Sequence, residues 1–145
     1  HTGCGGVKAG MQAAVESAEN EKAGKAVEPP LPGSVAETIS KWIAPIKSIA
    51  GSQLTSGQQP SSDPLDNLCL AHLTDAHVTD TVKAVADSEI VKAAWAEGRE
   101  LSVHGWVYHV ATAKLRDLGC GWKGVDQPAD SLSRPSTYAE SEPRE

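Results

Sequence analysis

The sequence has little of what builds a large core or crosses a membrane. It contains no phenylalanine, and Leu, Ile and Val together make up 27 of the 145 residues, about 19%, near the lower limit for a chain that folds around a core. No apolar run approaches the roughly 20 residues that span a bilayer, and no signal-peptide pattern begins the chain. We therefore expect one thin-cored, soluble domain in the cytoplasm, without a membrane partner.

Cysteine and positive charge are also scarce. The three cysteines, Cys4, Cys69 and Cys120, form an odd and sparse set, which favours a reducing compartment over a disulfide framework. Lys and Arg number 13 against 19 Asp and Glu, which gives a net charge of −6. Because the basic residues are not gathered into a patch, the composition argues against a nucleic-acid partner.

Apolar spacing predicts two helices in the first third of the chain. The first covers about 7–18. The second begins at Ser34 and Glu37, which form a capping-box pair, and must bend or restart at Pro45 because proline cannot donate a helical hydrogen bond. Between them, the polar stretch 19–33 is predicted to be a loop. Three prolines lie in that loop: Pro29, Pro30 and Pro32.

A second loop and two further helices are predicted next. The loop covers 51–64, which holds no anchoring apolar run. A long helical region follows from about Leu65, and Asp87 with Ser88 can cap a shorter helix after it.

The apolar period changes at 101–110, which predicts a strand. A turn at 111–114 and a short run at 115–118 would complete a hairpin. The residues from 119 to 145 become rich in Pro, Ser and acidic side chains, so we expect a disordered tail after a domain at 1–118. The strand has two predicted faces, one with Leu101, Val103 and Val107 and the other with Trp106, Tyr108 and Val110.

The first six residues, HTGCGG, read as part of a metal site. His1 and Cys4 can place an imidazole nitrogen and a thiolate on one zinc ion. Gly5 and Gly6 let the backbone pass close to a bound ion or substrate, and the start of a helix electrostatically favours a nearby thiolate. Two ligands do not complete a tetrahedral site, so further ligands must come from elsewhere.

The chain offers one way to complete this site itself. Cys69 and His72 form a Cys-x-x-His pair on a predicted helix, and with His1 and Cys4 they would make a closed Cys2His2 structural site. The competing interpretation is that Cys69 is a small buried side chain and His72 a polar surface residue. His104 is interpreted as a packed strand residue rather than a proton shuttle.

Four motifs together resemble a known family. They are HTGCGGV at 1–7, KWIAPI at 41–46, LTDAHVTDTV at 73–82 and LSVHGWVYHVATAKLRDL at 101–118. In order and spacing they are similar to the C-terminal half of a β-class carbonic anhydrase. The resemblance implies an α/β fold with helices packed on a parallel sheet, of which only the last strand and the hairpin are present in this chain.

The resemblance also implies a zinc lyase that interconverts carbon dioxide and bicarbonate. In that family two cysteines and one histidine hold Zn²⁺, with water or an aspartate in the fourth position. His1 and Cys4 match the histidine and the second cysteine, and Gly5 and Gly6 match the lining of the site. Two thiolates and an imidazole leave one position open, where zinc lowers the pKa of a bound water toward neutrality. Because the family works as dimers or larger assemblies, a homodimer or higher homo-oligomer is expected.

The chain departs from this family in two ways. The Cys-x-Asp-x-Arg motif, which carries the first zinc cysteine and an Asp-Arg dyad, is absent, so the catalytic residues are unknown and we expect a fragment that is weak or inactive alone. Ala113 stands where the family has a turn glycine, so a turn that needs a positive φ would be strained. The alternatives are a non-catalytic interaction module and a small structural zinc domain that uses Cys69 and His72.

Overall fold

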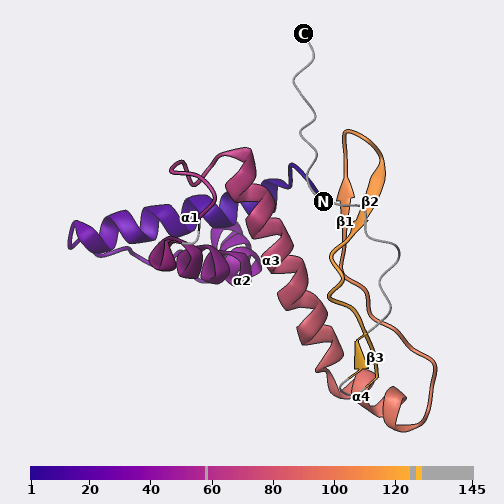
Figure 1. The fold of residues 1–145 in the computed structure, drawn as a ribbon. Helices are drawn as coiled ribbons and strands as arrows, with labels where there is room; N and C mark the ends of the chain where they lie inside the picture. The colour runs from indigo at the N-terminus through magenta and orange to yellow at the C-terminus, as the bar shows by residue number, and fades with distance from the viewer. Residues whose placement is uncertain (58, 125–126, 129–145) are drawn as a thin grey trace. The chain divides into compact units, whose positions relative to one another are not determined.

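The chain divides into two units, residues 1–80 and 81–145, in a computed structural model that describes residues 1–57, 59–124 and 127–128 (Figure 1). The first unit holds helices α1 (Gly5–Lys22) and α2 (Val35–Ser56) and most of α3 (Asn67–Ala86), which continues into the second unit. The second unit also holds one helix and four short strands: α4 (Glu89–Ala96), β1 (Trp106–His109), β2 (Lys114–Asp117), β3 (Trp122–Gly124) and β4 (Gln127–Pro128).

Helices α1 and α2 pack closely because two glycines of α1 face large side chains of α2. A Cβ added to Gly6 would lie 2.6 Å from the Trp42 ring, and one added to Gly10 would lie 2.5 Å from Cγ2 of Ile46. Gly10 lies four residues after Gly6 in α1, and Ile46 lies four residues after Trp42 in α2. The two helices therefore run in the same direction. The loop between them must therefore travel back along the length of α1.

The core of the first unit is small and lies where three helices meet. Its members recur at intervals of three or four residues within each helix, which places them on one face. Cys4 and four apolar side chains pack against it while remaining partly exposed. This core consists of Val7, Met11 and Ala14 from α1, Ile46 and Ala50 from α2, and Cys69 and Leu73 from α3.

The predicted start of α2 is confirmed, whereas its predicted end is wrong. Ser34 Oγ accepts a hydrogen bond of 3.1 Å from the amide of Glu37, as a capping residue should. The helix continues through Pro45 without restarting and extends to Ser56, so the loop predicted from residue 51 begins six residues later. Gly57, with φ of 66°, provides the left-handed C-cap that Gly51 does not.

Local caps also define α3 and α4. Asp66 Oδ1 accepts a hydrogen bond of 2.8 Å from the amide of Cys69 in the first turn of α3. This bond and one from the Ser61 hydroxyl lower the pKa of the Asp66 carboxyl, the Ser61 bond having the larger effect. Ser88 caps α4 through a weak bond of 3.5 Å from the amide of Val91, which confirms the predicted second helix start.

The predicted hairpin is confirmed, with a shorter first strand. β1 and β2 pair antiparallel, and His109 lies opposite Lys114 across the turn. Val107 is buried, with 1% of its surface exposed, whereas Trp106 and Tyr108 are 40% and 43% exposed, so the predicted alternation holds within β1. Ala113 has φ of 53° and is the one non-glycine residue with positive φ in the described ranges.

The rest of the sheet structure was not predicted from the sequence. Val103 lies outside β1 and forms an isolated antiparallel bridge with Trp122 of β3, and β3 pairs antiparallel with β4. The described strands form two antiparallel pairs, and no parallel pair occurs among them. The predicted boundary at 118 stays a prediction, and residues 125–126 and 129–145 of the predicted tail lie outside the described residues. Within the described part, none of the helices has the length and apolar character needed to cross a bilayer.

Candidate metal site

The candidate metal ligands lie just before and at the start of α1. His1 is exposed, and its Nδ1 donates a hydrogen bond of 3.0 Å to the carbonyl oxygen of Thr2. A carbonyl can only accept, so Nδ1 carries the proton and the lone pair of Nε2 is left available. Metal-binding histidines commonly use one nitrogen for a carbonyl and the other for the metal, so this arrangement suits a ligand.

Cys4 occupies the N-cap position of α1. Its carbonyl accepts a hydrogen bond of 3.1 Å from the amide of Lys8, and its side chain makes no capping bond. The thiol is therefore not engaged by the helix that it precedes. It is half-buried against the core of the first unit, and it lies beside the positive end of the helix dipole.

The two glycines that follow Cys4 are the first residues of α1. Gly5 is exposed, with no heavy atom within 4 Å of an added Cβ. Gly6 is half-buried and lies against Trp42, so its lack of a side chain already has a packing role in this structure. Their predicted role in lining the site remains a prediction.

His1 and Cys4 do not fit a zinc ion by themselves. An imidazole and a thiolate are donors of the right chemistry, but a tetrahedral zinc site with an open position needs a third protein ligand. Within residues 1–57, 59–124 and 127–128, no three His, Cys, Asp or Glu side chains are grouped so that they could hold a metal ion. The donor set in this part of the chain is therefore incomplete.

The structure does not assemble the predicted Cys2His2 alternative. Cys69 is buried, with 1% of its surface exposed, and its Sγ donates a weak hydrogen bond of 3.7 Å to the carbonyl of Ser61. Burial raises the pKa of the Cys69 thiol, and the carboxylate of Asp66 adds to the effect, so the thiolate that zinc binds is disfavoured. His72 is exposed on the same helix. One face of α3 thus buries the cysteine while the histidine points to solvent.

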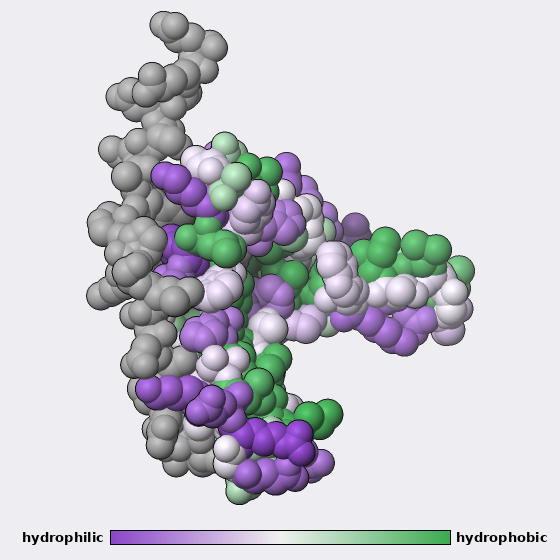
Figure 2. Space-filling model, turned by 90° about the vertical axis from the view of Figure 1, so that its right-hand side faces the viewer, coloured by the Kyte–Doolittle hydropathy of each residue, from purple (hydrophilic) through white to green (hydrophobic). Residues whose placement is uncertain are grey.

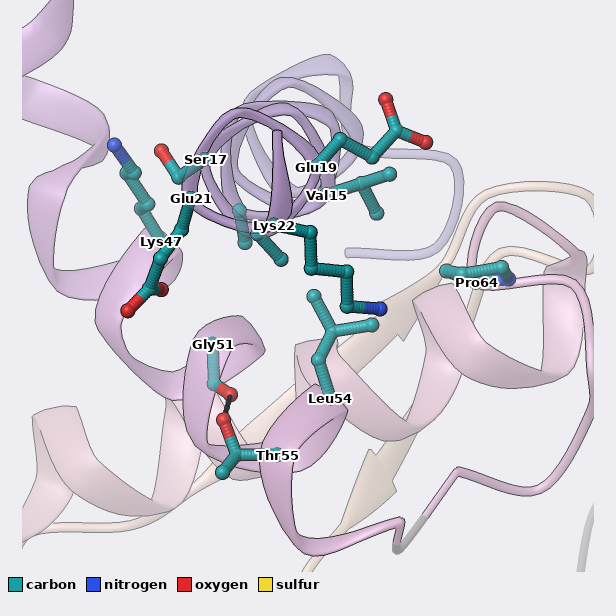
Figure 3. A pocket seen from close by; sticks show the side chains of 12 residues that line it. Val15, Ser17, Glu19, Glu21, Lys22, Lys47, Gly51, Leu54, Thr55 and Pro64 are labelled. Carbon is teal, nitrogen blue, oxygen red and sulfur yellow. Dashed lines mark hydrogen bonds between the residues drawn. The ribbon is translucent and has the colours of Figure 1, made fainter. Parts of the chain in front are cut away.

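A pocket of about 740 Å³ opens between the later turns of α1 and α2 (Figure 3). Neither His1 nor Cys4 lines it. In Figure 3 the Lys22 side chain extends over Leu54, and Thr55 donates to the carbonyl of Gly51 at 2.8 Å. With no His or Cys among its lining residues, this pocket is not the candidate metal site.

His104 is half-buried, but it lies two residues before β1 rather than within a strand, so the predicted strand position is wrong. Its Nε2 is 3.0 Å from the hydroxyl of Ser102, and its ring centre is 5.5 Å from that of Trp106. Trp95 is half-buried and donates from Nε1 to the carbonyl of Leu101 at 2.8 Å. These side chains have structural partners of their own, and they belong to a different unit from His1 and Cys4.

Comparison with known proteins agrees with the motifs and with the fold. Residues 1–115 match the carbonic anhydrase family. A β-carbonic anhydrase from Coccomyxa, solved in complex with acetazolamide, is 25% identical with a TM-score of 0.60, over 86% of this chain and 46% of that chain. A second solved structure comes from work on two tetrameric β-carbonic anhydrases of the filamentous ascomycete Sordaria macrospora. It is 20% identical with a TM-score of 0.55, over 83% of this chain and 50% of that chain. At this identity the similarity supports the fold of this chain and nothing further.

The chain therefore spans about half the length of these solved relatives. Its helices and small antiparallel sheet correspond to part of their α/β fold. The family match covers most of the sequence, from the His-x-x-Cys motif through the first residues of β2. Motifs, fold and family match agree, and the chain belongs to the β-class carbonic anhydrase family.

Proposed function

We propose that this chain is part of a zinc-dependent carbonic anhydrase, which interconverts carbon dioxide and bicarbonate, and that His1 and Cys4 are two of its zinc ligands. The observation that carries the proposal is the family match over residues 1–115, which includes both ligands. The accepting nitrogen of His1 and the uncapped thiol of Cys4 support it, because neither donor is occupied by another role. Zinc supplies Lewis-acid chemistry in such sites.

The remaining ligands and the catalytic groups lie, in this proposal, outside these 145 residues. Two observations support this: the described residues bring no third donor to the pair, and the solved relatives are about twice as long as the matched region. The isolated chain is accordingly expected to hydrate carbon dioxide weakly or not at all, because catalytic zinc sites use three protein ligands and the described residues supply two.

The complete enzyme is proposed to be a homodimer or a larger homo-oligomer. One of the solved relatives comes from work on tetrameric enzymes, and this chain exposes many large apolar side chains. Figure 2 shows hydrophobic surface among the hydrophilic side chains on one face of the described residues. The free energy falls when another surface covers exposed apolar groups and removes them from water. The most exposed include Val35, Trp42, Ile90 and Leu115.

The first test measures bound zinc and activity on the purified chain. We expect less than stoichiometric zinc and a stopped-flow hydration rate near the uncatalysed one. Cys4→Ser and, as a matched control, Cys120→Ser both remove a half-buried free thiol. Stoichiometric zinc that is lost only in Cys4→Ser would contradict the claim that the other ligands lie outside the chain.

The second test supplies the missing part. The segment of the Coccomyxa enzyme that this chain does not match is joined to it or co-expressed with it, and zinc and hydration are measured again. We expect both to appear, to be lost in Cys4→Ser and to survive in Cys120→Ser. A folded, zinc-free and inactive assembly would refute the proposal and favour a non-catalytic interaction module.

A further inference from the structure

The loop between α1 and α2 carries an exposed, proline-rich segment that the metal site does not use. The segment reads Val-Glu-Pro-Pro-Leu-Pro from Val27 to Pro32, and every residue of 21–33 is exposed. Leu31 exposes 79% of its surface and Val27 exposes 65%. The loop thus presents two large apolar side chains to solvent on a connection that buries none of its own residues.

The sequence restricts this segment to one kind of backbone. Proline fixes φ near −65°, and a residue that precedes proline is pushed away from the helical region toward extended values of ψ. One or both restrictions apply to each of the five residues from Glu28 to Pro32. This stretch is therefore preset to polyproline II geometry, so little conformational entropy remains to be lost when a partner binds it.

Hydrogen bonds close the end of α1 before the segment and the turn at the end of the segment. At the end of α1, the amide of Gly24 donates to the carbonyl of Glu21 at 3.1 Å. At the start of α2, the amide of Ser34 donates to the carbonyl of Leu31 at 3.1 Å, and Gly33 has φ of 75°. Proline followed by a glycine of positive φ, closed by such a bond, is a type II turn, whose proline also has the extended geometry.

The middle of the segment is open to a partner. The backbone groups of residues 26–30 make no backbone hydrogen bond with any other residue that the structure describes. Their carbonyl oxygens therefore remain as acceptors. Aromatic-lined grooves that bind polyproline II segments use such carbonyls together with proline rings and an apolar side chain.

The distance that the loop must span explains why it is extended, but it does not explain why Leu31 is an exposed apolar residue. Because α1 and α2 run in the same direction, the loop must return over roughly 30 Å, about the length of either helix at 1.5 Å per residue. Twelve residues in polyproline II geometry span about 37 Å at 3.1 Å per residue, so the prolines serve that purpose. A polar residue in place of Leu31 would connect the helices equally well and would not expose apolar surface.

We propose that the Pro29–Pro32 segment, Pro-Pro-Leu-Pro, is a docking motif for a protein domain whose aromatic-lined groove binds polyproline II ligands, of the WW type. The motif is separated in sequence from His1 and Cys4 by the whole of α1, and the proposal does not depend on zinc or on catalysis.

The test uses the full chain and a purified WW domain that binds Pro-Pro-Leu-Pro peptides. Binding is measured by calorimetric titration, with a synthetic peptide of residues 24–34 as competitor. Pro30→Ala and Leu31→Ala alter the motif. Ile90→Ala is the matched control, because Ile90 is an apolar side chain with 84% exposure on α4, far from the loop in sequence. Circular dichroism checks that each variant keeps its helices.

The expected result is saturable one-to-one binding that the peptide displaces. Each motif variant should weaken binding by about tenfold or more, as truncation of a central contact does, while Ile90→Ala leaves it unchanged. Three outcomes would overturn the proposal: no binding to chain or peptide, binding to the peptide but not to the intact chain, or equal weakening by Ile90→Ala, which would mean non-specific apolar adhesion.

Discussion

Replacing Gly10 by alanine tests the close packing of α1 on α2. Inside a helix, alanine is more favourable than glycine by about 1 kcal/mol, so the substitution would stabilise an isolated helix. In this structure the new Cβ would lie 2.5 Å from Cγ2 and 2.9 Å from Cβ of Ile46, which is itself 94% buried. The Ile46 Cβ is attached directly to the backbone, so a rotamer change cannot move it away.

Gly51→Ala provides the matched control. Gly51 also lies inside a helix, and nothing lies within 4 Å of its added Cβ, so only the gain in helix propensity of about 1 kcal/mol remains. At Gly10 the same gain is opposed by an overpacking cost of about 1–3 kcal/mol. The two variants should therefore differ in free energy of unfolding by about 1–3 kcal/mol, with Gly10→Ala the less stable.

Urea titration followed by circular dichroism measures both free energies. In an Ile46→Ala background the penalty at Gly10 should shrink, because the nearer of the two clashing atoms has been removed, and a double-mutant cycle would report this coupling. Equal stabilisation by Gly10→Ala and Gly51→Ala would refute the close approach of the two helices. It would also remove the geometric argument that the connecting loop is extended.

Three further predictions concern charge, turn strain and thiol burial. The ion pair with Lys41 (2.8 Å), and then the Gly33 amide (2.6 Å), hold the pKa of Glu37 below its ordinary value. The ionised Glu37 carboxylate therefore stabilises the fold at pH values above its ordinary pKa, and this stabilisation is lost as the pH falls through its lowered pKa. The difference in Tm between the parent and Glu37→Gln should accordingly vanish between about pH 5 and pH 3. A Tm difference that does not change with pH would contradict this. Ala113→Gly should relieve the positive φ of 53° and stabilise the hairpin by about 1 kcal/mol, seen as slower amide exchange of Val107, and faster exchange would argue against strain. Burial raises the pKa of the Cys69 thiol, so Cys69 should react with a thiol reagent only when the chain unfolds, while Cys4 and Cys120 react in the native chain. Fast reaction of all three thiols in the native chain would show that Cys69 is not buried.

Local chemistry made several elements predictable. The start of α2 follows from Ser34 and Glu37, whose bond joins groups three residues apart, and the start of α4 follows from Ser88 in the same way. The alternation around Val107 predicted the hairpin, because successive side chains of a strand point to opposite faces. His1 and Cys4 could be named as candidate ligands because their chemistry and spacing lie in four consecutive residues.

The failures have a common cause in contacts between distant residues. The end of α2 depends on which glycine adopts the left-handed conformation, and the sequence offers both Gly51 and Gly57. Of the two outcomes predicted at Pro45, a bend or a restart, the restart does not occur, and packing of Ile46 in the core supports the helix beyond the proline. Strand β3 was missed because Trp122 pairs with Val103, nineteen residues earlier in the chain.

By itself, the sequence determined the helix starts, the hairpin, the candidate ligand pair and the family, because each depends on neighbouring residues or on motifs in a fixed order. Tertiary structure decided the fate of Cys69 and His72, which the spacing places together on one helix. The core takes Cys69 into its interior and leaves His72 in solvent. Burial disfavours the thiolate that a metal would need, and burial is set by the packing of three helices rather than by the order of residues within one.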